Sequence, residues 1–186
     1  MRDLSAAEIQ SFPLVAGPGA RVLVLGSMPG AESLRRQQYY GHPQNLFWGL
    51  MGRLFGAGPA LEYEERLARL RAARVALWDV AHRCRRFGSL DANIKTQSVV
   101  PNDFSHLLRL YPGIHTVFFN GAKSAELFRR LVLPTLPSGD GLCSETLPST
   151  SPANASIPHA VKIARWEAVK LAAARPHHAG LIPEER

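Results

Sequence analysis

The fold is decided by the stretch Arg21-Val-Leu-Val-Leu-Gly-Ser-Met-Pro-Gly30, which is followed by Tyr39-Tyr-Gly-His-Pro-Gln-Asn-Leu-Phe-Trp48. Residues 21–26 predict a buried strand, and Gly26, Pro29 and Gly30 turn the chain sharply at its end. In open α/β sheets, ligands bind beyond the carboxyl ends of such strands. A tight turn, two aromatic faces and an amide together suit a flat polar heterocycle, such as a nucleobase.

Strand and helix patterns alternate along the rest of the chain. Further strands are predicted over residues 74–80, 115–119 and 143–147. Helices are predicted over residues 5–12, 45–55, 62–73, 102–111, 122–132 and 158–174, with Asn45 and Asn102 as N-caps. Residues 27–44 and 81–96 have neither pattern and are predicted to be irregular.

This alternation predicts an α/β fold. We expect a three-layer sandwich whose central, mostly parallel four-stranded sheet carries helices on both faces. A single domain is expected over residues 1–186, with its core at about residues 20–174. Polar clusters follow all four predicted strands, so we expect them to meet at one edge of the sheet. They are Gly26–Gly30, Asp79–Cys84, Asn120–Gly121 and Pro148–Asn154.

The charge, cysteine content and hydrophobicity of the chain limit the classes of partner and the compartment to be expected. The formal net charge is +7 and the sequence pI is about 10.0, which favours nucleic acid, although a basic surface without a partner explains the charge equally well. Two cysteines and no signal-peptide pattern suggest the cytoplasm, and we expect a bacterial, nucleoid-associated protein. No apolar stretch is long enough for a membrane span, so no membrane partner is expected.

Neither a metal nor a cofactor is expected. His82 and Cys84 are too few for a zinc site, where four ligands in paired spacing are typical. The run Gly26–Gly30 lacks the glycine pattern of dinucleotide-binding and P-loop motifs.

Five motifs resemble one family. The runs Gly26-Ser-Met-Pro-Gly30 and His42-Pro-x-Asn-x-Phe-Trp48 resemble the first motif of the uracil-DNA glycosylase superfamily, the second being close to its mismatch-specific branch. The details are similar to the hypoxanthine-DNA (deoxyinosine) glycosylase branch. Those details are Gly26-Ser-Met-Pro-Gly30, Leu77-Trp-Asp-Val80, Gly88-Ser-Leu-Asp-Ala-Asn-Ile94, Phe119-Asn-Gly121 and Pro148-Ser-Thr-Ser-Pro-Ala-Asn154.

Two positions depart from the pattern of many superfamily members. Met28 stands where an Asp or Asn often positions the attacking water, and Leu147 stands where His or Asn often begins the second motif. The hypoxanthine branch resembles this sequence at both positions. There the catalytic amide comes from the His-Pro-x-Asn run, which maps onto Asn45, and the aromatic plate maps onto Tyr40.

The resemblance implies a monofunctional DNA glycosylase that acts as a monomer on double-stranded DNA with a deaminated base, hypoxanthine being preferred. Two alternatives stay open: a uracil or mismatch-specific uracil glycosylase, and a non-catalytic module that binds damaged DNA. Asn45 is the predicted catalytic residue. The predicted base-binding residues are Gly26, Ser27, Met28, Tyr40, Asp79 and Asn120. The predicted DNA-backbone contacts are Ser149, Thr150, Ser151, Arg83 and Arg85.

Each of these residues also has a purely structural interpretation. Asn45 can cap a helix, and Asp79 and Asn120 can cap or form turns. The basic run Arg83–Arg86 can be an ordinary solvated face. By the same reasoning Phe47, Trp48 and Trp166 are predicted to lie in the core and not to enter the DNA stack.

Overall fold

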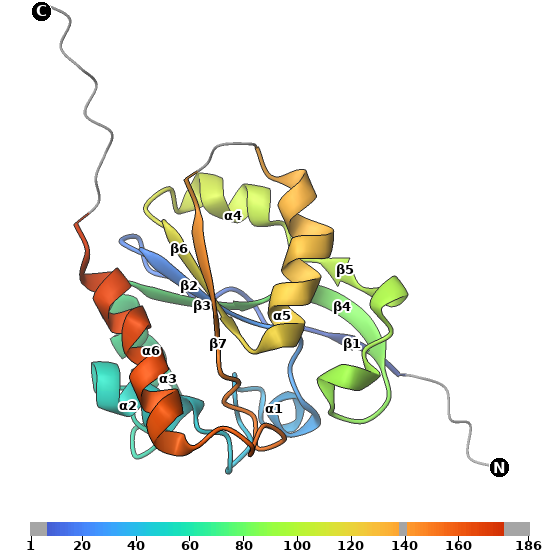
Figure 1. The fold of residues 1–186 in the computed structure, drawn as a ribbon, viewed down its shortest axis with the longest axis horizontal. Helices are drawn as coiled ribbons and strands as arrows, with labels where there is room; N and C mark the ends of the chain where they lie inside the picture. The colour runs from blue at the N-terminus through green and yellow to red at the C-terminus, as the bar shows by residue number, and fades with distance from the viewer. Residues whose placement is uncertain (1–6, 138–140, 177–186) are drawn as a thin grey trace, which may run out of the picture.

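The central sheet is four-stranded and fully parallel. In the computed structural model, which describes residues 7–137 and 141–176, its strands are β2 (Val22–Gly26), β3 (Val75–Asp79), β6 (Thr116–Asn120) and β7 (Cys143–Leu147). They lie in the order β3-β2-β6-β7, and every pairing is parallel (Figure 1). The predicted sheet is confirmed, and its strands all end at one edge.

Helices cover both faces of this sheet. Side chains alternate along a strand, so Val22 and Val24 face one layer while Leu23 and Leu25 face the other. The first layer holds α2 (Phe47–Phe55), α3 (Tyr63–Ala72) and α6 (His159–Ala174). The second holds α4 (Phe104–Leu110) and α5 (Ala122–Leu127), and Figure 1 shows the two groups on opposite sides. The three-layer prediction is confirmed.

The aromatic residues predicted for the core are buried there. Trp166 and Phe47 are fully buried and Trp48 is 4% exposed. Phe47 contacts both tryptophan rings edge-on, with centroids 5.0 and 5.9 Å away. This cluster joins α2 to α6 beneath the sheet edge where the strands end.

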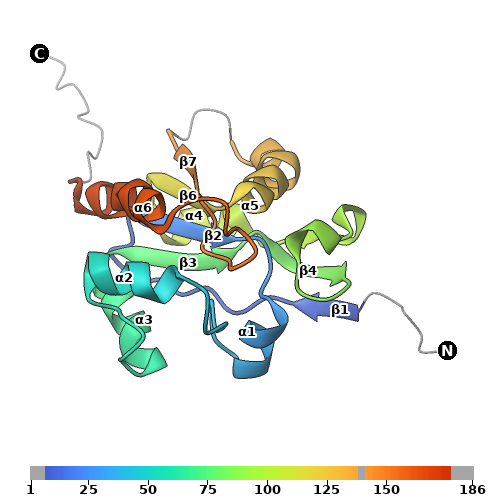
Figure 2. The same ribbon diagram turned by 60° about the horizontal axis from the view of Figure 1, so that its bottom comes forward.

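A second, three-stranded sheet was not predicted. It consists of β1 (Ala7–Gln10), β4 (Ala81–Arg86) and β5 (Val100–Pro101), in the order β1-β4-β5 and antiparallel (Figure 2). The predicted helix over 5–12 is therefore wrong over its described part, and residues 81–86 are not irregular. A short segment gains little from forming an isolated helix, whereas the edge of β4 offers it backbone partners.

The predicted irregular segment 27–44 contains a short helix, α1 (Ala31–Arg36). Glu32 forms ion pairs with Arg35 and Arg36, each with a nitrogen–oxygen distance of 2.6 Å. These contacts, three and four residues apart, support a helix that has too few apolar residues to show a period.

Two helix boundaries differ in detail from the prediction. Asp103, not Asn102, caps α4, because its Oδ1 accepts a hydrogen bond of 2.8 Å from the His106 N–H. Asn102 instead donates from Nδ2 to the Asp79 carbonyl oxygen at 2.8 Å. The predicted helix 122–132 forms as α5 followed by a π-helical segment, Phe128–Val132, and a 3-10 turn follows over Leu133–Thr135. Further 3-10 turns span Asp91–Asn93 and Thr96–Ser98.

Among the helices that the structure describes, none combines the length and the apolar character that crossing a membrane requires.

Candidate active site

A cavity of about 590 Å³ opens at the carboxyl ends of the central strands. It is lined by the turn Gly26–Gly30, by Tyr40 and Asn45, by Asp79 and Asn120, and by the turn Ser149–Asn154. Its volume lies in the ordinary range for small-molecule pockets. All of the predicted base-binding residues meet here, together with Asn45, as the positions of the strand ends led us to expect.

The segment that carries Tyr40 is held from several sides. Trp48 donates from Nε1 to the Tyr39 carbonyl oxygen at 2.8 Å, and the Tyr63 hydroxyl accepts from the Tyr39 N–H at 2.9 Å. Tyr40 itself adopts a left-handed backbone conformation, with φ of 53°. Its ring stacks on Phe47 with centroids 3.9 Å apart. The core therefore supports one face of the Tyr40 ring from behind.

Asn45 leads into α2 and lines the cavity. Its Oδ1 accepts a hydrogen bond of 3.0 Å from the Phe47 N–H, which is the local bond expected of an Asn before a helix. The helix itself begins at Phe47, with Leu46 in the cap position. The prediction of Asn45 as the N-cap is therefore wrong by one residue. Its amide oxygen still bonds the first N–H of the helix, which leaves the Nδ2 group unused beside the cavity.

Asp79 is the most deeply buried carboxyl group at the cavity, with only 3% of its surface exposed. Its Oδ2 has no hydrogen-bond partner among the described residues. Gly26 lies directly opposite, and a Cβ at that position would collide with Asp79 Oδ1. The glycine therefore makes room for the carboxyl group.

A second carboxylate, that of Asp91, acts on Asp79. Burial first, and then the Asp91 charge, raises the pKa of Asp79 to about 8, while the Arg86 guanidinium lowers it. Burial also raises the pKa of Asp91, although a hydrogen bond from Ser27 Oγ to Asp91 Oδ1 at 2.6 Å opposes this. Asp79 therefore carries a proton at neutral pH, and its carboxylic acid can donate as well as accept a hydrogen bond.

Arg86 ties the two loops around these carboxyl groups together. Its Nη2 donates to the Pro29 carbonyl oxygen at 2.6 Å and its Nε to the Gly88 carbonyl oxygen at 2.8 Å. Only 3% of Arg86 is exposed, so this residue does not belong to a solvated basic face. Neither Asp91 nor this role of Arg86 was predicted, although Asp91 lies in the Gly88–Ile94 motif.

Asn120 and Thr150 hold each other. Asn120 Nδ2 donates to Thr150 Oγ1, and Asn120 Oδ1 accepts from the Thr150 N–H, both at 2.8 Å. Thr150 is fully buried, which leaves it without the exposure that a phosphate contact needs. Asn120 lines the cavity while fixing the turn after β7.

The same turn is fastened to α6. Trp166 donates from Nε1 to the Pro148 carbonyl oxygen at 2.9 Å, and Lys162 donates from Nζ to the Asn154 carbonyl oxygen at 2.7 Å. Ser149 and Ser151 line the cavity on this turn and are partly exposed. Their placement suits the predicted contact with a DNA backbone.

Of the remaining predicted residues, two line the cavity and two lie outside it. Ser27 lines the cavity with its hydroxyl bonded to Asp91. Met28 lines it too, but the whole residue is only 5% exposed and its side chain packs with Ala81 and Cys84. Arg83 and Arg85 are exposed on β4 and do not line the cavity.

The described residues contain no group of three or more His, Cys, Asp or Glu side chains placed to hold a metal ion.

Comparisons with known proteins identify the family. The family model "Uracil DNA glycosylase superfamily" matches residues 13–170. A hypoxanthine DNA glycosylase of Methanosarcina acetivorans is 38% identical over 161 residues, which cover 86% of this chain and 96% of the relative. A hypoxanthine DNA glycosylase of Methanosarcina barkeri is 42% identical over 118 residues, covering 63% and 73% respectively.

A solved structure shares the fold. The solution NMR structure of a candidate uracil DNA glycosylase from Methanosarcina acetivorans matches with a TM-score of 0.74 and 35% identity, and the match covers 91% of this chain and 100% of that one. With the family model spanning both the central sheet and the cavity, the chain belongs to the uracil DNA glycosylase superfamily.

Proposed function

We propose that this protein is a monofunctional DNA glycosylase that hydrolyses the N-glycosidic bond of hypoxanthine in double-stranded DNA. The observation that carries the proposal is the buried, unpartnered Asp79 carboxyl group in a cavity that Asn45 and Tyr40 also line. Two relatives whose names are hypoxanthine DNA glycosylase support the choice of base.

Asp79 suits the hydrogen-bonding edge of hypoxanthine. That edge presents an oxygen acceptor, O6, beside an N–H donor, N1. A protonated carboxyl group presents a donor beside an acceptor and can bind both atoms at once. Because the pKa of Asp79 is raised to about 8, the acid is mostly protonated at pH 7 and avoids placing a negative charge against O6.

The target nucleotide must leave the duplex to reach this cavity. Flipping it out costs roughly a few kcal/mol, less for a mispaired base. Stacking on an aromatic face returns about 1–3 kcal/mol per base. Tyr40 is the proposed plate, since Phe47 supports its ring from the core side.

Bond breaking builds positive charge on the sugar and negative charge on the departing base. Donors directed at the base stabilise this transition state more than the ground state, and they are proposed to supply most of the rate. Asp79 supplies one such donor, and the backbone N–H groups of Ser27 and Met28, which line the same cavity, are proposed as others. Asn45 is proposed to orient the attacking water through its Nδ2 group, because an amide is a poor general base.

Contacts outside the cavity complete the proposal. Ser149 and Ser151 are proposed to bind phosphates beside the target, and Arg83 and Arg85 to attract the DNA at longer range. No lysine is found among the described residues that line the cavity, which supports hydrolysis without a Schiff base. We further propose a monomer that acts in the cytoplasm on nucleoid DNA.

Uracil excision is the second candidate, because the structural match at 35% identity is to a candidate uracil DNA glycosylase. Uracil presents a similar oxygen and N–H pair, so Asp79 does not exclude it. A duplex with one inosine, incubated with excess enzyme and then treated with alkali, tests the reaction itself. Strand breakage at inosine supports a glycosylase. Tight binding with intact strands would instead show a non-catalytic module.

A further inference from the structure

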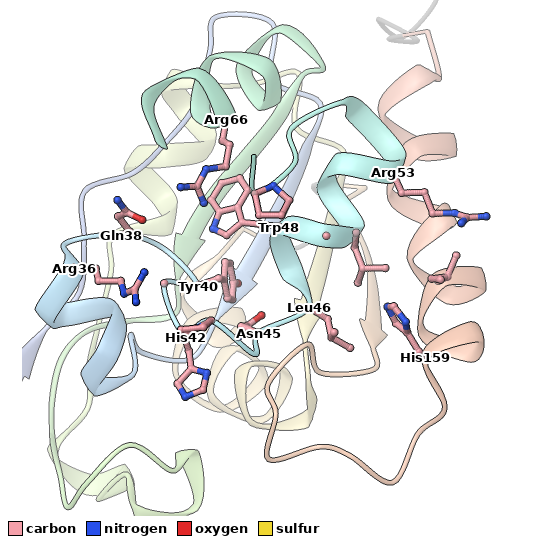
Figure 3. Close-up of a pocket in the computed structure, with 16 residues that line it drawn as sticks. Arg36, Gln38, Tyr40, His42, Asn45, Leu46, Trp48, Arg53, Arg66 and His159 are labelled. Carbon is pink, nitrogen blue, oxygen red and sulfur yellow. The ribbon is translucent and has the colours of Figure 1, made fainter. Parts of the chain in front are cut away.

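A second cavity, of about 540 Å³, lies next to the base cavity. Tyr40, His42 and Asn45 line both cavities, so this one segment separates them. Beyond that segment the second cavity is lined by α2 and by residues of α3 and α6, as Figure 3 shows. We call it the arginine groove.

The arginine groove is cationic. Arg36, Arg53 and Arg66 line it, His42 and His159 stand at its edge, and no Asp or Glu is among the described lining residues. Figure 3 shows Arg66 beside the Trp48 ring, Arg36 on one side of the groove, and Arg53 and His159 on the other. Cations gathered around one hollow attract an anion that extends along it.

Two of these arginines are not neutralised by neighbours. Arg36 forms an ion pair with Glu32, but within the described residues neither Arg53 nor Arg66 has one. The Arg66 guanidinium lies 4.8 Å from the Trp48 ring centroid, and its Nε is buried without an acceptor among the described residues. A buried donor without an acceptor is costly, so an anionic ligand in the groove would stabilise it.

We propose that the arginine groove binds the sugar-phosphate backbone of the strand that carries the target nucleotide, next to the flipped base. A strand whose base enters the first cavity must pass the Tyr40–Asn45 segment, and the groove begins on its other side. Guanidinium groups match phosphate oxygens in geometry. Leu46 and Ile163, which are both partly exposed, offer apolar surface for a sugar between the phosphates. This inference rests on the proposed function.

The test compares Arg53→Gln and Arg66→Gln with a matched control, Arg69→Gln. Arg69 lies on α3 one turn from Arg66, does not line the groove and pairs with Glu65 at 3.0 Å. Binding is measured to a duplex with a stable abasic-site analogue, so no result depends on catalysis. Arg53 is exposed, so its replacement leaves the fold intact even if Arg66→Gln does not.

Each groove variant is expected to make one phosphate contact fewer, and so to release fewer counterions from the DNA when it binds. Between 50 and 200 mM salt its affinity should therefore fall about threefold less than that of the wild type. In a second experiment, single phosphates of the target strand near the abasic site are replaced by neutral methylphosphonates. One or two positions should weaken the wild type and Arg69→Gln but leave the groove variants unchanged.

The four possible outcomes have distinct meanings. The proposal is supported if the groove variants are insensitive to methylphosphonate substitution only at target-strand positions near the abasic site. Equal losses in the wild type and the groove variants at every position overturn it, and so does insensitivity on the complementary strand. If the wild type binds no DNA at all, the proposed function fails instead, which separates the two failures.

Discussion

Replacing Asp79 by Asn tests whether the protonated form of this buried carboxyl group recognises the base through a hydrogen bond. Asn keeps a donor beside an acceptor in nearly the same shape, but it does not titrate. In the wild type, the pKa of about 8 means that most Asp79 is protonated at pH 7 and roughly one tenth at pH 9. The excision rate should therefore fall about tenfold between these pH values because the donor is lost.

The assay is single-turnover cleavage of an inosine duplex from pH 6 to 9.5. The N1–H of inosine also ionises in alkali, so the informative quantity is the ratio of the variant rate to the wild-type rate. That ratio should rise about tenfold from pH 7 to pH 9. Asp103→Asn is the control, since Asp103 is exposed at the start of α4 and Asn also caps helices well. A ratio that stays constant across this range would refute the reasoning.

Three further predictions concern stability and catalysis. Because the pKa of Asp79 is raised in the folded state, the folded protein keeps a proton that the unfolded chain has released above about pH 4. The contribution of Asp79 to stability is therefore full below about pH 4 and is lost as pH rises through about 8. In thermal denaturation, Asp79→Asn should melt closer to the wild type at pH 5 and above it at pH 9. Asn45→Ala should lower the single-turnover rate about 100-fold or more while abasic-duplex binding changes little; an unchanged rate would remove Asn45 from the reaction. Asn120→Ala should cost about 1–3 kcal/mol in chemical denaturation, because it removes both hydrogen bonds to the buried Thr150, whereas a neutral effect would mean that the turn does not depend on them.

Much of the sheet could be predicted because its strands have simple patterns. Residues 22–25 and 75–77 are buried on both faces, so they read as continuous apolar runs between turn residues. Cys143–Leu147 was predicted with the observed bounds. Parallel strands place their carboxyl ends at one edge, and this rule alone predicts that Gly26, Asp79 and Asn120 lie together.

The second sheet could not be predicted because it depends on long-range pairing. β1 gains its backbone partners from β4, more than 70 residues later, and Ala7–Gln10 alone has no strand period. β4 was not recognised as a strand because its sequence is basic, although its Cys84 and Arg86 side chains are buried. A buried arginine reads as a surface residue in sequence, because only its partners in space explain it.

The sequence predicted which residues line the candidate site, but not the contacts that they make with one another. Sequence places Asn45 before a helix and Asp79 after a strand, yet it does not show that Asp91 lies beside Asp79 or that Asn120 holds Thr150. These contacts arise where loops far apart in the chain meet. The arginine groove was missed for the same reason, since Arg36, Arg53 and Arg66 come from three different helices.

The most direct test of the proposed function is single-turnover cleavage of matched duplexes that carry inosine, uracil or xanthine at one position, each followed by alkali. Faster strand breakage at inosine than at uracil is the predicted result, and Asn45→Ala should abolish most of it. Breakage at uracil with inosine left intact would contradict the proposed base preference.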